Sequence, residues 1–175
     1  MKNKKGLIFA SILLAIIILS LAGYRYHVVN RTYKSAHFVT EKIVPLQQEI
    51  QTKNVHFKVL DTNKKQAGDH VTVDVLASIK LLGLNDYGFK KNNKNFVENI
   101  WLNIPYFDPG VAAEVYTEDG KRFVSKDLSL LQETKLKFHF DVTKQEISHQ
   151  DEPMRFSFLV PEKEKTFIKY SVLVP

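Results

Sequence analysis

The sequence predicts a mainly β protein, an antiparallel β-sandwich of about seven or eight strands preceded by one transmembrane helix. Three observations lead to this fold class. Gly6 to Tyr24 is a run of 19 residues without a charged side chain. Beyond Lys53, apolar residues alternate with polar ones, which is the two-residue period of a half-buried strand. Turn-forming residues recur at short intervals between these strands, as they do in two-sheet folds.

The uncharged run is just long enough to cross a bilayer as a helix. At about 1.5 Å per residue it spans roughly 28 Å, against a hydrocarbon thickness of about 30 Å. Three lysines lie within residues 1–5, and Arg25, Arg31 and Lys34 follow the run, so the charge balance favours a cytoplasmic N-terminus only slightly. We expect a cytoplasmic segment (1–5), a signal anchor (6–24), a single-pass position in the cell membrane and an extracytoplasmic remainder.

A cleaved signal peptide is the alternative interpretation of the same run. Ser20, Leu21 and Ala22 form the small-x-small pattern that precedes a cleavage site. Cleavage near Ala22 would start the mature chain at Gly23 and secrete it. Both interpretations export the rest of the chain, and the absence of cysteine excludes attachment through a lipid-modified cysteine.

The exported part is expected to fold as one domain without disulfides, because the chain has no cysteine. Roughly 150 residues follow the apolar run, enough to bury about two thirds of the unfolded surface. Three of the 25 basic residues lie within 1–24, which leaves 22 basic against 19 acidic residues. This balance gives no sign of nucleic-acid binding.

Residues 25–52 are interpreted as a juxtamembrane stalk. Apolar residues from Val28 to Leu46 recur at an irregular spacing of three to four, which is compatible with a helix that continues until Pro45 interrupts it. The β-sandwich domain is therefore expected to cover residues 53–175.

Alternation predicts three strands in the first half of this domain, at residues 55–59, 71–79 and 96–104. The polar segment 63–69 contains a glycine and is expected to turn between the first two strands. In the third strand, Trp101 is expected to face away from Ile100 and Leu102.

The second half repeats this pattern. The pair Asp119-Gly120 is a strong hairpin signal and lies between the expected strands 111–117 and 122–125. Alternating or continuous apolar residues then predict three further strands, at 136–142, 154–160 and 167–174.

Several of these segments together resemble the exported immunoglobulin-like domains of the DUF4352 type. The resemblance rests on the strand Val71–Val75, the hairpin Tyr116–Lys121 and the strand end Met154–Pro161, behind a membrane segment and a polar stalk. It covers about 53–175 and implies an immunoglobulin-like fold at the surface or membrane of a Gram-positive bacterium. It implies no assigned activity and no catalytic residues.

No motif for catalysis, cofactor binding or metal binding follows the apolar run. The six histidines are scattered, and His56 and His139 are expected as solvated residues on the polar faces of their strands. Sortase chemistry needs a cysteine nucleophile, which the chain lacks. No Gly-x-Ser-x-Gly, Ser-x-x-Lys or glycine-rich phosphate loop occurs. We therefore expect no enzyme activity, no cofactor and no metal.

Two aromatic segments are the candidate partner-binding sites. The first comprises Trp101, Tyr106, Phe107 and Asp108, and the second comprises Tyr87, Phe89, Lys90 and Lys91 within the 84–95 insert. Pro105 and Pro109 cannot donate ladder hydrogen bonds, so the first segment is expected to leave the sheet as a loop that presents its aromatics. Its alternative is that Tyr106 or Phe107 folds back to cap the sandwich. The second segment would meet anionic polymer or lipid headgroups, or is simply a solvated charged loop.

The predicted function is binding or structural support. The leading hypothesis is a membrane-anchored extracytoplasmic β-sandwich that binds a protein or a cell-envelope component. The alternative is an accessory subunit of an export, conjugation or pilus-type apparatus. A pilin form of this alternative predicts processing after Gly6, but Ser11 stands where pilins usually have glutamate.

Overall fold

The computed structural model divides the chain into two compact units, Met1–His37 and Phe38–Pro175. The residues it describes are 2–34, 38–85, 87, 96–105, 107–124, 128–147, 152–163 and 166–175.

The first unit consists of one long helix, α1 (Lys2–Lys34). Its uncharged run is rich in leucine and alanine, which favour the helical backbone. The large apolar side chains described in this run, from Ile8 to Tyr24, are all between 48% and 71% exposed. Within the described residues, no helix combines the length and the apolar character that a membrane crossing requires.

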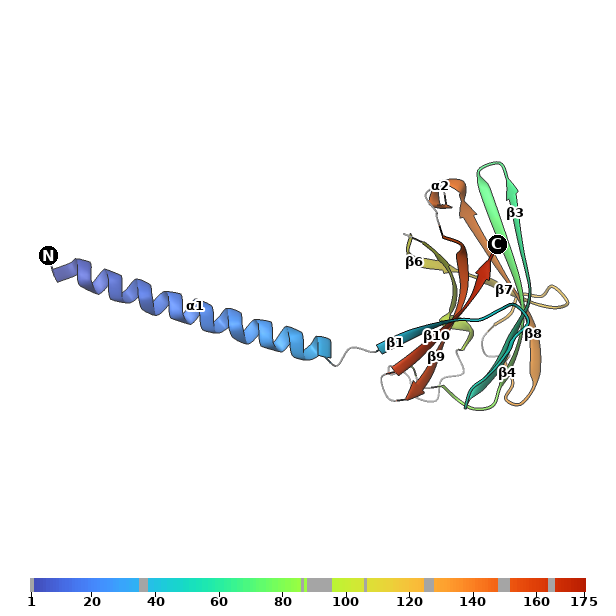
Figure 1. Ribbon diagram of the computed structural model, residues 1–175, viewed down its shortest axis with the longest axis horizontal. Helices are drawn as coiled ribbons and strands as arrows, with labels where there is room; N and C mark the ends of the chain where they lie inside the picture. The colour runs from blue at the N-terminus through green and yellow to red at the C-terminus, as the bar shows by residue number, and fades with distance from the viewer. Residues whose placement is uncertain are drawn as a thin grey trace. The chain divides into compact units, whose positions relative to one another are not determined.

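The second unit is a β-sandwich whose two sheets pack face to face (Figure 1). In the described residues sheet A has the order β1-β10-β9-β5-β6, and sheet B has the order β2-β3-β4-β8-β7. The strands of sheet A are β1 (Phe38–Ile43), β5 (Ile100–Ile104), β6 (Phe107–Ala112), β9 (Met154–Lys163) and β10 (Thr166–Val174). Those of sheet B are β2 (Glu49–Gln51), β3 (Val55–Ala67), β4 (His70–Leu81), β7 (Glu114–Thr117) and β8 (Glu133–Thr143). A 3-10 turn, η1 (Val97–Asn99), and a short helix, α2 (Lys144–Ile147), complete the described elements.

The predicted mainly β sandwich is confirmed, but the described residues form ten strands rather than seven or eight. The predicted single strand 111–117 is wrong, because the chain passes there from β6 in sheet A to β7 in sheet B. Two further strands, β1 and β2, lie inside the segment predicted as a stalk. The compact unit therefore begins at Phe38 rather than at residue 53. Because β1 pairs in parallel with β10, the partner that holds it in strand form lies at the far end of the sequence, where local periodicity gives no hint of it.

Alternate residues of the central strands fill the space between the sheets, as predicted. Phe57 on β3 stacks on Phe158 on β9, with ring centroids 4.3 Å apart. Phe96 stacks on Phe158 at 5.8 Å and lies 5.7 Å from Phe57, so the three rings contact one another. All three rings are at most 2% exposed. This aromatic cluster joins the two sheets, since it draws side chains from both.

The two predicted turns between strands are present at their glycines. Gly68 closes the β3–β4 hairpin with a φ of 62°, and Gly120 lies in the turn after β7 with a φ of 79°. The predicted return strand after Gly120 is reduced to a single bridge between Tyr116 and Arg122. The predicted strand 96–104 is likewise shorter, since η1 precedes β5.

Candidate functional site

Trp101, one of the predicted partner-binding residues, lies on the outer face of sheet A. Its neighbours Ile100 and Leu102 on β5 point into the core, so Trp101 and Asn103 point outward, as the alternation predicts. The indole N–H of Trp101 donates a hydrogen bond of 2.9 Å to Oδ1 of Asn103. Trp101 is half-buried, and its polar edge is already satisfied within the domain.

A chain of hydrogen bonds continues from Asn103 across the outer face. Its side-chain amide donates to the hydroxyl of Ser157 on β9 at 2.7 Å. The hydroxyls of Ser157 and Ser171, the latter on β10, lie 2.8 Å apart. Both serines are fully buried, and each hydroxyl has partners, as buried polar groups require.

Glu41 on β1 ends this chain as its anionic member. The hydroxyl of Ser171 donates to Oε1 of Glu41 at 2.6 Å. Lys169 lies 3.3 Å from Oε1, and Arg155 lies 3.2 Å from Oε2. Burial by itself raises the pKa of Glu41, but the Ser171 hydrogen bond and the two cations outweigh it and lower the pKa below its ordinary value. The carboxylate thus stays ionised and holds β1 to β10.

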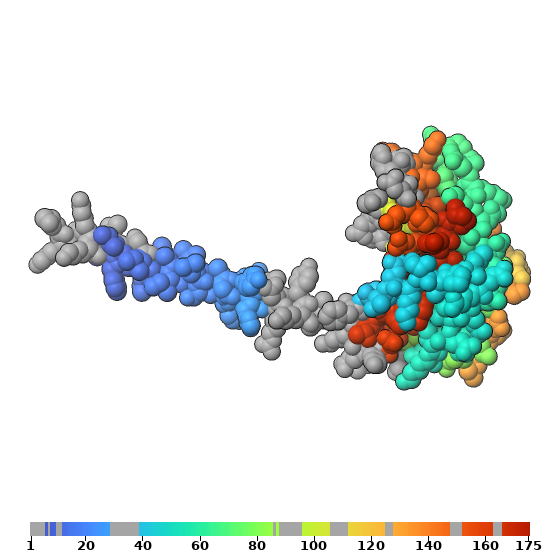
Figure 2. Space-filling view, in the orientation of Figure 1, coloured from blue at the N-terminus to red at the C-terminus, as the bar shows by residue number. Residues whose placement is uncertain are grey.

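Exposed aliphatic side chains surround this polar chain. Val39 and Ile43 are 52% and 51% exposed, and they share the face of Glu41 because they lie two positions away from it on β1. Leu173, 44% exposed, follows Ser171 by two positions on β10 and pairs with Arg155 in the ladder. We call these three residues the β1–β10 patch. Figure 2 shows β1, in cyan, beside the red residues of β10.

Tyr87, from the second predicted segment, also packs on sheet A. Its hydroxyl donates to the backbone carbonyl of Leu159 at 3.0 Å, and its ring stacks on Phe167 with centroids 6.2 Å apart. Burial raises the pKa of Tyr87 well above its ordinary value. Tyr87 therefore contributes to packing, while Phe89, Lys90 and Lys91 lie outside the described residues.

The prediction that the segment after β5 leaves the sheet is wrong from Phe107 onward. Phe107 and Asp108 belong to β6, which pairs with β5, and Pro109 lies within the same strand. A proline is tolerated there because β6 is the edge of sheet A and one side of its backbone needs no partner. The side chains of Phe107 and Asp108, and all of Tyr106, lie outside the described residues.

Of the predicted site residues, the structure describes the side chains of Trp101 and Tyr87, and both pack on sheet A. The sequence does not predict Glu41, Arg155 and Ser171 as site residues, because its pattern places residues 38–43 in a stalk and a charged residue on a strand usually indicates a solvated position. One usable signal was present. Ser157 and Ser171 are small polar residues within strands that are otherwise rich in large apolar residues, which indicates a hydrogen-bonded position rather than a core one.

Comparison with known proteins adds one structural similarity. No family model matches this chain, and no curated protein does. The chain is similar to an uncharacterized β-sandwich protein from Clostridium difficile 630, with 16% sequence identity and a TM-score of 0.48. The similarity covers 75% of this chain and 94% of that one. The resemblance to the DUF4352 type and the Gram-positive origin stay predictions.

The outer face of sheet B carries contacts between histidine and aspartate side chains. Nδ1 of His139 lies 2.7 Å from Asp74, and Nδ1 of His70 lies 3.1 Å from Asp141. Burial opposes the ionisation of Asp74, but the hydrogen bonds from His139 and Lys137 outweigh it and lower its pKa. Among the described residues, no three histidine or carboxylate side chains gather as metal ligands.

Proposed function

We propose that this protein is a membrane-anchored binding module whose β-sandwich recognises an apolar surface of a partner protein outside the cytoplasm. The observation that carries the proposal is the β1–β10 patch. Its three aliphatic side chains are about half exposed, and they border a hydrogen-bonded chain that fixes the strands beneath them. Exposed apolar groups on a rigid support are typical of protein interfaces.

The charges around the patch favour a protein partner over an anionic polymer or a lipid headgroup. Arg155 contacts Glu41 at 3.2 Å and Glu152 at 2.7 Å, and Lys169 contacts Glu41 at 3.3 Å. The cations beside the patch are thus already neutralised within the domain. A polyanion would have to displace these carboxylates, whereas an apolar protein surface would leave them in place at the rim.

The anchoring part of the proposal rests on the apolar run in α1. Its described large side chains are exposed all round the helix. Burial of these side chains in lipid or protein would gain about 0.8 kcal/mol of free energy for each CH₂ group removed from water. A helix that is apolar on every side needs lipid or other protein around it. Leu7, Ala10 and Ser11, which complete the run in the sequence, have side chains outside the described residues.

We also propose that the sandwich has an immunoglobulin-like topology, which the strand order supports. The neighbours β3-β4-β8-β7 in one sheet and β10-β9-β5-β6 in the other correspond to the orders ABED and GFCC′ of immunoglobulin domains. In this correspondence β1 is an added strand that pairs in parallel with β10. The patch then lies on the sheet formed by strands G, F, C and C′.

Site-specific photocrosslinking in cells tests the binding role. A photoreactive residue in place of Ile43 should capture a partner protein, whereas the same residue in place of Val124, 48% exposed and outside the patch, should not. Ile43→Glu or Leu173→Glu should abolish capture through a second crosslinking position at Val39, with thermal unfolding unchanged. Identical adducts from the Ile43 and Val124 positions would show that the β1–β10 patch is not the binding surface. A crosslinked adduct of twice the chain mass would show that the partner is a second copy of this chain and not a different protein.

Membrane extraction and mass spectrometry of the mature N-terminus test the anchoring role. We expect the intact N-terminal segment in a membrane fraction that resists alkaline carbonate. A mature chain that starts at Gly23 would show cleavage and secretion instead. A mature chain that starts at Leu7 would favour the alternative hypothesis of a pilin-like subunit that is processed after Gly6.

A further inference from the structure

A groove opens between the two sheets where the chain crosses from β6 to β7. It encloses about 320 Å³, within the range of roughly 300 to 1,000 Å³ that is typical of small-molecule sites. Its lining residues are Val97, Glu98, Ile100, Ala112, Ala113, Glu114, Val115, Arg122 and Phe123. Ala112 ends β6 and Ala113 links it to β7. Their small side chains leave space that larger ones would fill.

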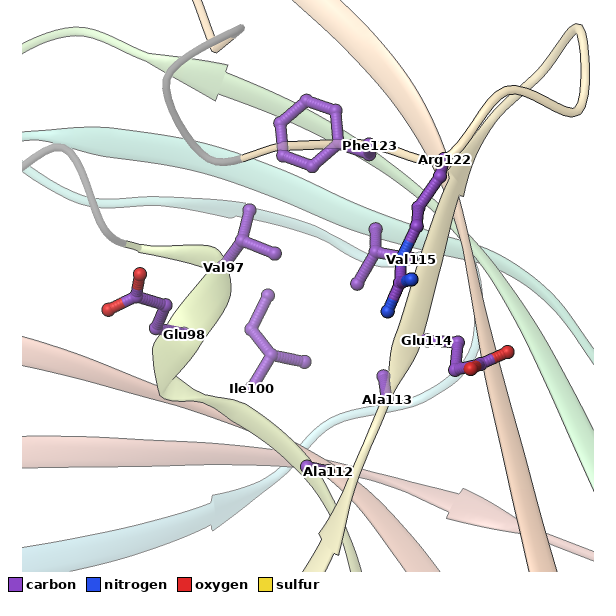
Figure 3. Close-up of a pocket in the computed structure, with 9 residues that line it drawn as sticks. All are labelled: Val97, Glu98, Ile100, Ala112, Ala113, Glu114, Val115, Arg122 and Phe123. Atoms are coloured by element: carbon purple, nitrogen blue, oxygen red, sulfur yellow. The ribbon is translucent and has the colours of Figure 1, made fainter.

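The lining of the groove combines apolar side chains with three charged ones, Glu98, Glu114 and Arg122. Figure 3 shows Val97 and Ile100 pointing in from one side and Val115 pointing in from the other, with Phe123 at one end. Val97, Ile100 and Phe123 are 8%, 4% and 9% exposed, so the groove reaches the edge of the core. An apolar group bound here would be shielded from water on several sides. This removal of apolar surface from water is the main source of affinity in such sites.

One cation lies at this groove. Figure 3 shows the guanidinium of Arg122 turned toward Val115 and the groove, while the carboxylates of Glu98 and Glu114 point away from it. Among the described residues, no carboxylate lies within 4.0 Å of the Arg122 guanidinium. Arg122 is held in place by its backbone bridge to Tyr116, and the next residue, Phe123, donates its backbone N–H to Val115 at 2.8 Å. The cation therefore lies at the mouth of the groove.

We propose that the groove binds a small apolar carboxylate, with the apolar part between Val97, Ile100 and Val115 and the carboxylate on the Arg122 guanidinium. Arginine and carboxylate match in geometry and form strong charge-assisted hydrogen bonds. Two sources offer this chemistry, a free short-chain acid and the carboxyl-terminal residue of a peptide with an apolar side chain.

Titration of the full chain in lipid nanodiscs, followed by the methyl NMR signals of Ala113 and Val115, tests the proposal. Hexanoate should shift these signals saturably, and hexanol and hexylamine should bind at least ten times more weakly. Arg122→Gln should weaken hexanoate binding about tenfold, the loss expected for one charge-assisted contact. Empty nanodiscs give the background for probe partitioning.

Two further variants separate the site from a general effect. Lys121→Gln removes an adjacent positive charge that is paired with Asp119 at 2.7 Å, and it should leave hexanoate binding unchanged. Ala113→Leu should fill the groove and abolish binding, with thermal unfolding showing that the sandwich is intact. A tripeptide ending in leucine, with a free or an amidated terminus, then distinguishes the two sources. Equal binding of hexanol and hexanoate, or no effect of Arg122→Gln, would overturn the proposal.

Discussion

The hydroxyl of Ser171 donates a 2.6 Å hydrogen bond to the carboxylate of Glu41, which lies 130 positions earlier in the chain. The bond joins the first strand of the sandwich to the last, and Lys169 and Arg155 reinforce it from the same face. β1 lies at the edge of sheet A and has one strand neighbour, β10. β1 and β10 pair over six residues, and the side-chain contacts of Glu41 add to this backbone pairing. These contacts therefore help to hold Val39 and Ile43 of the β1–β10 patch in place.

Replacement of Glu41 by glutamine should weaken this attachment. The variant retains an acceptor for Ser171 but loses the attraction to Lys169 and Arg155, so the free energy of unfolding should fall by about 1 kcal/mol. Urea unfolding followed by the fluorescence of Trp101, the single tryptophan, measures the change. Glu152→Gln is the matched control, because that carboxylate is 56% exposed and its loss should cost less than about 0.5 kcal/mol. Equal losses in the two variants would show that Glu41 has no special role.

The contribution of Glu41 should also depend on pH. The folded state lowers the pKa of this group below its ordinary value, so the folded protein binds fewer protons than the unfolded chain. Its stabilisation is fully present above the ordinary glutamate pKa of about 4.3 and is lost as the pH falls through the lower folded value. The stability difference between wild type and Glu41→Gln should be constant from pH 7 to about 5 and should shrink below that. A difference that stays constant down to pH 3 would contradict the lowered pKa.

Removal of one ring from the aromatic cluster should be far more costly. Phe158 is fully buried and stacks on Phe57 at 4.3 Å and on Phe96 at 5.8 Å. Phe158→Ala leaves a cavity that both sheets line, and the expected loss is about 3 to 5 kcal/mol. Leu173→Ala, on the same sheet but 44% exposed, should change stability by less than about 0.5 kcal/mol. Comparable losses in the two variants would place the core elsewhere.

The sequence predicted the core well because burial on one face of a strand leaves a local signature. Val55, Phe57 and Val59 alternate with polar residues and are all buried. The same reasoning misses β1, because an edge strand with both faces partly in solvent shows no strict alternation. It also misses the Glu41–Ser171 contact, which depends on pairing between strands at opposite ends of the chain. The candidate site was thus predictable where Trp101 faces outward, and unpredictable where distant strands meet.

The turn at Gly120 should tolerate asparagine better than alanine. Gly120 has a φ of 79°, which is in the left-handed region, and its N–H donates to the carbonyl of Thr117 at 2.9 Å. A Cβ atom at this position would meet no atom within 4 Å, so any cost of substitution comes from the backbone conformation alone. Gly120→Ala should therefore lose about 1 to 2 kcal/mol of unfolding free energy, and Gly120→Asn should lose less, since asparagine enters this region more readily. Urea unfolding of both variants measures the order, and an alanine variant as stable as wild type would mean that the turn relaxes to a negative φ.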